Sequence, residues 1–456
     1  MSKPPKSRLA RVARLGAMTG RVGASYVGRR LKGVVEGTEL RERALKRLHL
    51  ENAEQIMETV GRLKGAAMKV GQSLAVVAST LDLPDDVQAV LGKLHDSVEP
   101  MPFDVIQQDV ESSLERSLDD AFAWFSVEPL GTASLAQAHA ARLHDGTEVV
   151  VKVLHRGIET SVGADIAALK TALVGARLLR RPKDETDAIF DEIRDRLNEE
   201  LDYLQEASNI AQFGRMFGDD PHLRIPAVHP SHSTDRVLTL DHLPGLPIHR
   251  FVQEASPEAR QRAGRTIGEL YYRMVFQHRT LHADPHPGNY LFEPDGRVGL
   301  LDYGCVKRFD PYWVADYART ALAALDGDRD GCMQGCRECG VLVGDDQRTR
   351  DALWAYCEIL IGPFRGGRYR AGGPSDNLTG PLMDSLRPLM ASRSIRFERT
   401  LVYLHRALAG NYALLKELEA EEDWGGLLRA YAEHSTRIAL GQAPEGSPPE
   451  LIPPRT

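Results

Sequence analysis

The spacing of hydrophobic and polar residues changes twice along this chain. Up to about residue 118, apolar residues recur every three to four positions, as they do in amphipathic helices. From residue 125 to residue 153, short apolar runs are separated by turn-forming residues, which is typical of strands. Helical spacing dominates again up to about residue 430. The pattern therefore predicts an α+β chain in which one strand-rich region is flanked by helices.

Three strands are predicted in the strand-rich region. They cover Phe125–Leu130, a second segment that ends at Leu143, and Glu148–Val153. His144–Thr147 contains the Asp-Gly pair that hairpin turns favour. Small residues between Gly131 and Ala136 separate the first two strands, so we expect a loop there and a hairpin between the last two strands.

Helices are predicted on both sides of these strands, at residues 104–118, 158–180 and 251–281. Another helix should begin at about Asp187 and continue through an acidic stretch to about Asn209. Residues 236–241 form one more predicted strand, which ends in a Pro-Gly turn. The Pro-rich tail, residues 441–456, is expected to be disordered.

Composition and charge exclude several classes of protein. A net charge of −7 over 456 residues argues against nucleic-acid binding by bulk charge. Residues 1–32 are the exception, with nine Lys and Arg residues and no acidic one, which leaves open a solvated helix or a contact with anionic lipid. No apolar run is long enough for a transmembrane helix. Five cysteines fit a reducing cytoplasm, so we expect a cytoplasmic protein, with a peripheral membrane contact left open.

The strongest candidate chemistry lies between residues 282 and 304. Asp284 is followed five residues later by Asn289, and Asp302 ends an apolar run just before Tyr303 and Gly304. An acid that orients a hydroxyl, followed by two oxygen ligands for Mg²⁺, is the arrangement that phosphoryl transfer from a nucleotide requires. We therefore predict a kinase-like site in which Asp284 orients or deprotonates the acceptor hydroxyl and Asn289 and Asp302 are metal ligands.

Two upstream features fit the same chemistry. Gly131, Ala133 and Ala136 have the spacing of a phosphate-binding loop, and small residues there, Ser134 among them, would let backbone amides approach a nucleotide. Lys152 ends a Val-Val-Val run and can reach phosphates from its strand.

A lysine in this role needs a carboxylate that holds it in position. The candidates share one acidic stretch and are Glu199, Glu200, Asp202 and Glu206. On a continuous helix, Glu199, Asp202 and Glu206 would share a face. The strand that ends at Asp241 fits a hinge beside adenine, with Leu240 and His242 as the expected contacts.

Two further patterns are less specific. Lys69 and Gln72 lie three residues apart around Gly71 and would share a helical face, which by itself is compatible with ordinary solvent exposure. Cys332, Cys336 and Cys339 have a spacing that can hold an iron–sulfur cluster, but small buried cysteines on one helical face are the favoured interpretation.

Taken together, the motifs resemble the UbiB/AarF family of atypical protein-kinase-like proteins over residues 8–430. The resemblance rests on motifs that occur in the family's order, namely Lys69-Val70-Gly71-Gln72, the small-residue loop, Val151-Lys152, Glu200-Leu201-Asp202 with Glu206, His282 to Asn289, and Asp302-Tyr303-Gly304. Gly131-Thr132-Ala133-Ser134 departs from the family's Ala-rich loop, which puts the family's unusual nucleotide preference in doubt.

The resemblance implies a bilobal kinase-like fold with an N-terminal helical extension. It assigns residues 1–100 to the extension, 101–243 to an N-lobe with inserted helices, and 244–440 to a helical C-lobe. It also implies that Lys69 and Gln72 meet Glu200 and Asp202 at the active site, and that Glu206 pairs with Lys152. ATP and Mg²⁺ are the implied cofactors, and isoprenoid lipids are the implied partners in quinone metabolism.

We therefore expect an atypical kinase-like ATPase or small-molecule kinase. One alternative is an aminoglycoside-type phosphotransferase, which would not need residues 1–100 for activity. Another is a non-catalytic scaffold that binds nucleotide at a membrane and does not turn it over.

Overall fold

The computed structural model describes residues 100–132, 135–155, 183–374 and 376–449, together with single positions between 163 and 174. They divide into two compact units, which are treated separately here. The first unit comprises the described residues up to Ala207 together with Val228–His242, and the second comprises Ser208–Ala227 and the residues from Leu243 onwards. Helix α9 (Tyr203–Phe217) contributes its first five residues to the first unit and the others to the second.

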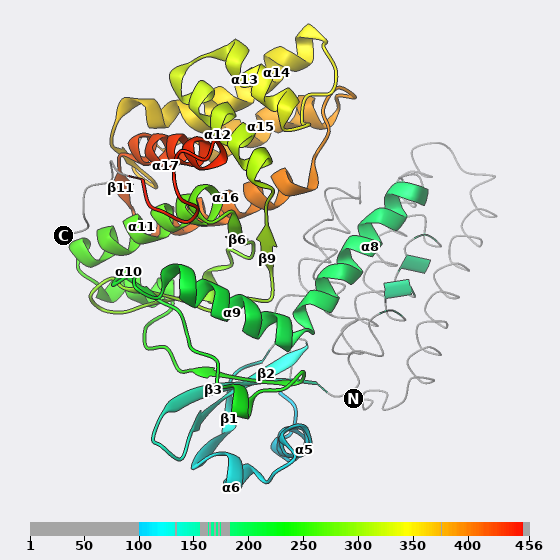
Figure 1. Cartoon of the computed structure of the whole chain (residues 1–456), viewed down its shortest axis with the longest axis vertical. Helices are drawn as coiled ribbons and strands as arrows, with labels where there is room; N and C mark the ends of the chain where they lie inside the picture. The colour runs from blue at the N-terminus through cyan, green and yellow to red at the C-terminus, as the bar shows by residue number, and fades with distance from the viewer. Residues whose placement is uncertain are drawn as a thin grey trace, which may run out of the picture. The chain divides into compact units, whose positions relative to one another are not determined.

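The first unit contains an antiparallel four-stranded sheet (Figure 1). Its strands lie in the order β1 (Trp124–Thr132), β2 (Ala136–Arg142), β3 (Glu148–Leu154) and β5 (Val237–Asp241). The predicted strands and the predicted hairpin between β2 and β3 are confirmed. Gly146 has φ +92° in this hairpin, a conformation that glycine adopts without strain, and the Thr147 amide donates to Asp145 Oδ1 at 2.9 Å.

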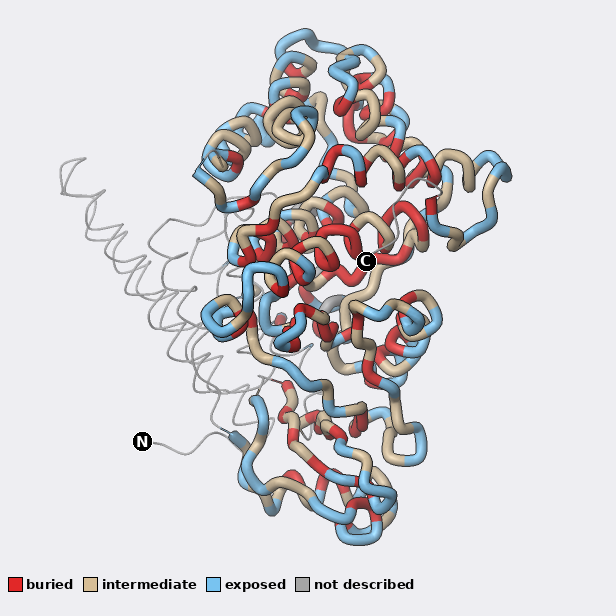
Figure 2. The backbone as a smooth tube through the Cα atoms, turned by 90° about the vertical axis from the view of Figure 1, so that its left-hand side faces the viewer, coloured by how far each residue is buried: buried red, intermediate tan, exposed pale blue. Residues whose placement is uncertain are grey.

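Alternation along β3 determines which side chains face the core of this unit. Val149, Val151 and Val153 are fully buried on one face, in a cluster with Ile106 and Val110 of helix α5 (Phe103–Leu114). Figure 2 shows these buried stretches of the sheet in red. Because successive side chains of a strand point to opposite faces, Lys152 lies on the face away from this core.

Two of the predicted helices are interrupted. The helix expected over residues 104–118 ends at Leu114, because Glu115 has a left-handed backbone with φ +56°, and a short helix α6 (Leu118–Ala121) follows. The helix expected from Asp187 is also wrong as one element, since α8 (Lys183–Glu200) and α9 are separated at residues 201–202. The acidic residues therefore do not share one helical face.

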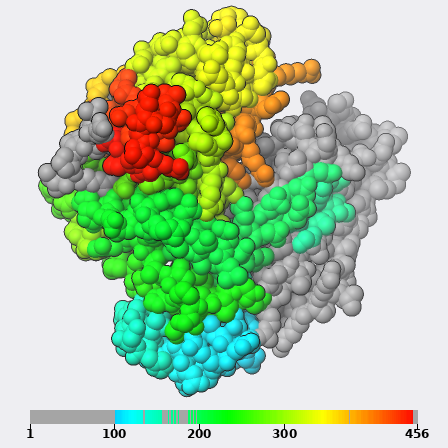
Figure 3. Space-filling view, viewed as in Figure 1, coloured from blue at the N-terminus to red at the C-terminus, as the bar shows by residue number. Residues whose placement is uncertain are grey.

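The second unit is mainly helical. Its longer helices are α10 (Ile248–Glu254), α11 (Pro257–Tyr272), α12 (Pro311–Asp326), α13 (Arg329–Glu338), α14 (Gln347–Ile361), α15 (Thr379–Met390), α16 (Arg399–Glu417) and α17 (Trp424–Ala439). The single helix predicted over 251–281 is divided, because Ser256 caps a new helix that begins with Pro257, and a π-helical turn at Arg273–Gln277 leads into a strand. Helices α12 and α17 pack together, and α17 reaches the surface as the red segment of Figure 3.

Short strands interrupt these helices and carry the candidate site. Strand β6 (Thr280–His282) pairs with β9 (Val306–Arg308), and β7 (Tyr290–Phe292) pairs with β8 (Val298–Leu300), which also pairs with β4 (Leu223–Arg224). Within the described part of the chain, no helix is both long and apolar enough to cross a bilayer.

The described part of the C-terminal tail is ordered by contacts with the second unit, which corrects the expected disorder for residues 441–449. Gln277 Nε2 donates to the Gly446 carbonyl oxygen at 2.6 Å, and His434 Nε2 donates to the Ser447 carbonyl oxygen at 2.8 Å. Both Gln277 and His434 are buried, so the tail supplies partners to polar groups that burial would otherwise penalise.

Candidate active site

In the first unit, Lys152 forms a two-pronged ion pair with Glu206. Its Nζ lies 2.7 Å from Glu206 Oε1 and 2.9 Å from Oε2. The Glu206 side chain is 4% exposed and that of Lys152 is 20% exposed, so the pair is largely removed from solvent. The Lys152 ammonium also lies 5.5 Å from the centre of the Tyr203 ring. The predicted pairing of Lys152 with Glu206 is thus confirmed, and the lysine is held in a defined position on its strand.

The break before α9 explains why Glu206 is the partner. Asp202 Oδ1 accepts from the Gln205 amide at 2.9 Å, and the Asp202 carbonyl oxygen accepts from the Glu206 amide at 2.9 Å. Asp202 therefore caps the start of α9, and Glu206 follows in the first turn. Glu200 is the last residue of α8. The four acidic candidates are thus divided between two helices and a cap.

In the second unit, two donors fix the carboxylate of Asp284. Asn289 Nδ2 donates to Asp284 Oδ2 at 2.8 Å and to its carbonyl oxygen at 3.0 Å. Arg406 Nη2 donates to Asp284 Oδ1 at 2.8 Å. The side chains of Asp284 and Arg406 are each 35% exposed, so the carboxylate is oriented and still reaches solvent.

Helix α16 supports this loop at two positions one turn apart. Arg406 provides the ion pair, and a Cβ atom at Gly410 would lie 2.3 Å from Pro285 Cγ, so only glycine lets the helix approach this closely. Neither residue was identified from the sequence. Their spacing of four indicates a shared helical face, but nothing local shows which loop that face contacts.

Strand pairing brings Asp302 close to Asn289 in the fold. Tyr290 pairs with Leu300, and the Leu301 amide donates to the Asn289 carbonyl oxygen at 2.8 Å. Asp302 has φ +54°, which is uncommon for a residue other than glycine, and its Oδ1 accepts from the Gly304 amide at 3.1 Å. Such strain is often found at functional sites.

A buried aromatic cluster holds this turn in position. His282 Nε2 donates to the Asp302 carbonyl oxygen, and its ring lies 5.5 Å from that of Tyr303. The Phe213 ring of α9 lies 5.1 Å from Tyr303, and Asn209 Nδ2 donates to the Tyr303 carbonyl oxygen at 2.9 Å. Tyr303 is therefore held between Phe213 of α9 and His282 of β6.

The donor atoms suit a divalent cation. Asn289 uses its amide nitrogen toward Asp284, so the amide oxygen is the atom suited to a cation, and Asp302 offers a carboxylate. Amide and carboxylate oxygens are hard ligands of the kind that Mg²⁺ prefers, and a nucleotide supplies the other ligands through its phosphates. The residues present therefore fit a magnesium–nucleotide complex.

The remaining predicted contacts are placed as follows. Gly131 lies inside β1, and not in a loop, and a Cβ atom there would meet nothing within 4 Å. Leu240 is buried in β5. The His242 amide donates to the Glu148 carbonyl oxygen at 3.0 Å, so this amide is already bonded within the sheet. Lys69, Gln72, Ala133 and Ser134 lie outside the described residues.

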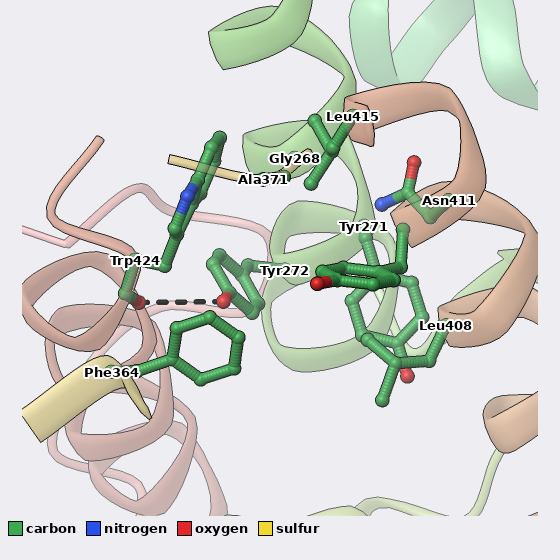
Figure 4. A pocket seen from close by; sticks show the side chains of 10 residues that line it. Gly268, Tyr271, Tyr272, Phe364, Ala371, Leu408, Asn411, Leu415 and Trp424 are labelled. Atoms are coloured by element: carbon green, nitrogen blue, oxygen red, sulfur yellow. Dashed lines mark hydrogen bonds between the residues drawn. The ribbon is translucent and has the colours of Figure 1, made fainter. Parts of the chain in front are cut away.

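Figure 4 shows a pocket in the second unit with a volume of about 50 Å³. Its walls are mostly aromatic and aliphatic, and they include Tyr272, Phe364 and Trp424. Sites for small molecules have volumes of roughly 300–1,000 Å³. The pocket is therefore too small for a nucleotide, and none of the predicted site residues lines it.

Comparison with known proteins finds atypical kinases and an atypical kinase-like domain. The family model of the ABC1 atypical kinase-like domain matches residues 93–336. Atypical kinase COQ8B, mitochondrial, from Rattus norvegicus is 29% identical over 92% of this chain and 79% of its own length. Atypical kinase COQ8, mitochondrial, from Saccharomyces cerevisiae is 28% identical over 80% of this chain and 72% of its own length.

A plant relative and a solved structure extend the comparison. Protein ACTIVITY OF BC1 COMPLEX KINASE 8, chloroplastic, from Arabidopsis thaliana is 31% identical over 83% of this chain and 53% of its own length. The complex of Rv3197 with erythromycin from Mycobacterium tuberculosis has a TM-score of 0.58 and 24% identity, and the match covers 85% of this chain and 97% of that chain. The structural likeness agrees with a kinase-like α+β fold. Since the family model matches more than half of the chain, this protein belongs to the UbiB/AarF family of atypical protein-kinase-like proteins.

Proposed function

We propose that this protein is an ATPase or small-molecule kinase that uses Mg²⁺-ATP. The observation that supports the proposal is the ion pair of Lys152 with Glu206, because a phosphate-binding lysine on a strand requires a carboxylate that fixes its ammonium. Membership of an atypical kinase-like family supports the same class of chemistry.

Each side chain has a distinct role in the proposal. Lys152 binds the phosphates, and Glu206 keeps its ammonium in place. Asn289 and Asp302 hold the metal ion, which draws charge from the phosphates when it is bound. Asp284 orients the hydroxyl of the acceptor, or a water molecule, and accepts its proton. Arg406 is a positioning residue, because it acts through the carboxylate of Asp284.

The biological setting is part of the proposal. Relatives that carry the name COQ8 suggest a role in quinone or isoprenoid-lipid metabolism. The basic residues of the first 32 positions favour a contact with anionic lipid at a membrane surface. We further propose, from the family resemblance alone, that Lys69 and Gln72 act with Glu200 and Asp202 beside the phosphates.

Phosphate release from Mg²⁺-ATP by the full chain tests the proposal. We expect turnover in the wild-type protein and its loss in Asp302→Asn, with Asp384→Asn as the matched control, because Asp384 is an exposed residue of α15. Turnover that rises with anionic liposomes would support the membrane setting. Turnover that persists in Asp302→Asn would contradict the assigned chemistry, and nucleotide binding without turnover would favour a scaffold.

A further inference from the structure

Three thiols converge in the second unit, among residues that take no part in the proposed chemistry. Cys332 and Cys336 lie one turn apart on α13, and Cys357 lies on α14. The three sulfur atoms all lie within 4.8 Å of one another. Among the residues that the structure describes, this is the one group of three or more His, Cys, Asp or Glu side chains close enough to share an ion.

The grouping differs from the one that the sequence suggested. Cys339 was expected to lie with Cys332 and Cys336, but it follows the last turn of α13, and its sulfur lies 3.9 Å from Thr320 Oγ1 of α12. Cys357, eighteen residues further along the chain, takes its place. The C-x₃-C-x₂-C spacing therefore does not form the three-thiol group.

Packing of small side chains explains the burial of these cysteines, but not their convergence. Cys332 and Cys336 belong to an apolar cluster with Met333, Leu342 and Leu353, and buried cysteine behaves as a small hydrophobic residue there. In such a cluster, however, each sulfur would pack equally well against aliphatic neighbours. Here, two helices direct all three sulfurs to one point.

The spacing of the sulfurs suits a bound metal ion. Thiolates bind zinc-sized ions at about 2.3 Å, so three of them around one ion lie about 4 Å apart. Sulfurs that already lie within 4.8 Å need to move by less than an ångström, which rotation of the side chains can supply. Cys332 and Cys336 are buried, and Cys357 is partly buried.

We propose that Cys332, Cys336 and Cys357 form a site for one soft monovalent cation of the Cu(I) class. Thiolates are soft ligands that select Cu(I) and zinc among the common metals. A structural zinc ion takes four ligands, whereas the described residues offer three here, in an apolar setting that disfavours a water molecule as the fourth. Each thiol that binds as a thiolate releases its proton to solvent.

Titration of the reduced full-length protein with Cu(I) tests this site, with a chromophoric Cu(I) chelator as competitor and oxygen excluded. We expect one tightly bound ion, and at least tenfold weaker binding in each of Cys332→Ser, Cys336→Ser and Cys357→Ser. Cys339→Ser is the matched control, since it removes a buried thiol of the same segment without touching the group. Its binding should equal that of the wild type.

X-ray absorption of the wild-type complex gives a readout that does not depend on the folding of a variant. Coordination by three sulfur atoms is the expected result. Nitrogen or oxygen ligands, equal loss of binding in Cys339→Ser, or no tight binding at all would overturn the site. Tight binding of Zn²⁺ in place of Cu(I) would overturn the assignment of the ion. None of these outcomes depends on ATP turnover, so the proposed function stands or fails separately.

Discussion

The two units hold their candidate site residues in opposite ways. In the first unit, one buried glutamate of α9 fixes Lys152 of strand β3 through both of its oxygens. In the second unit, the Asp284 side chain is about one-third exposed, and donors from its own loop and from α16 share its two oxygens. The first arrangement depends on one charge pair, and the second on several weaker contacts.

This difference follows from what each group is proposed to do. A lysine that binds phosphates can be held permanently, because its charge does not change during the reaction. A carboxylate that accepts a proton from the acceptor must be reachable by it, so deep burial of Asp284 would hinder this role. We therefore expect a substitution of Lys152 to lower both stability and activity. A substitution of Arg406, which contacts Asp284, should lower activity with little effect on stability.

Lys152→Met should have the largest effect. It removes the ammonium from which both Glu206 oxygens accept, and loss of one partner of a buried pair costs about 3 kcal/mol of unfolding free energy. Turnover should fall on the order of 10²–10³-fold, as it does when a preorganised charge-stabilising contact is removed. Urea unfolding and phosphate release measure the two quantities.

A double variant separates these two losses. Lys152→Met with Glu206→Leu should recover much of the stability and none of the turnover, because it replaces the pair with apolar groups. A double variant as unstable as Lys152→Met would show that the buried charge is not the cause.

Gly410→Ala should have the next largest effect, and it tests the packing of the Asp284 loop. The added Cβ would lie 2.3 Å from Pro285 Cγ, so the loop or α16 must move, at a cost of about 1–3 kcal/mol and with reduced turnover. Gly380→Ala in α15 is the matched control, since its Cβ would meet nothing within 4 Å. It should be neutral or slightly stabilising. Equal melting temperatures of the two variants would contradict the close approach of Gly410 to Pro285.

Arg406→Ala should lower activity with little effect on stability. The ion pair with Asp284 is about one-third exposed, so its loss should cost less than about 1 kcal/mol. A misplaced Asp284 should lower kcat roughly 10- to 100-fold and leave KM for ATP nearly unchanged. Arg406→Lys should recover part of kcat, and Arg387→Ala, at an exposed position of α15, should match the wild type. A change in KM alone would place Arg406 in nucleotide binding.

The smallest expected effect is a dependence of stability on pH in the second unit. Burial, together with the charges of Arg273 and Arg279, lowers the pKa of His278 from 6.5 to about 4. Between these values the unfolded chain binds a proton that the folded protein excludes, so stability is full above pH 6.5 and falls as the pH approaches 4. His278→Gln should show a smaller loss of melting temperature from pH 7 to pH 5. His249→Gln, at an exposed position of α10, should show the wild-type loss.

Local patterns were sufficient to predict some parts of the site. The apolar run before Lys152 predicted the strand that carries it, and the short spacing from Asp284 to Asn289 lets one side chain donate to the other within a single loop. The break between α8 and α9 was not predicted, because acidic residues on both sides of residues 201–202 are compatible with a continuous helix. Arg406 and Cys357 were missed because their partners lie far away in the sequence.

The sequence by itself determined the order of the motifs and the strands that carry them, and it led to the class of chemistry that we propose. These features depend on neighbouring residues, whose spacing limits local structure directly. Only the tertiary structure decided which acid holds Lys152, which helix supports Asp284 and which third cysteine joins Cys332 and Cys336. Such choices depend on contacts between distant segments, and these contacts are selected by the packing of the whole unit, which no local pattern records.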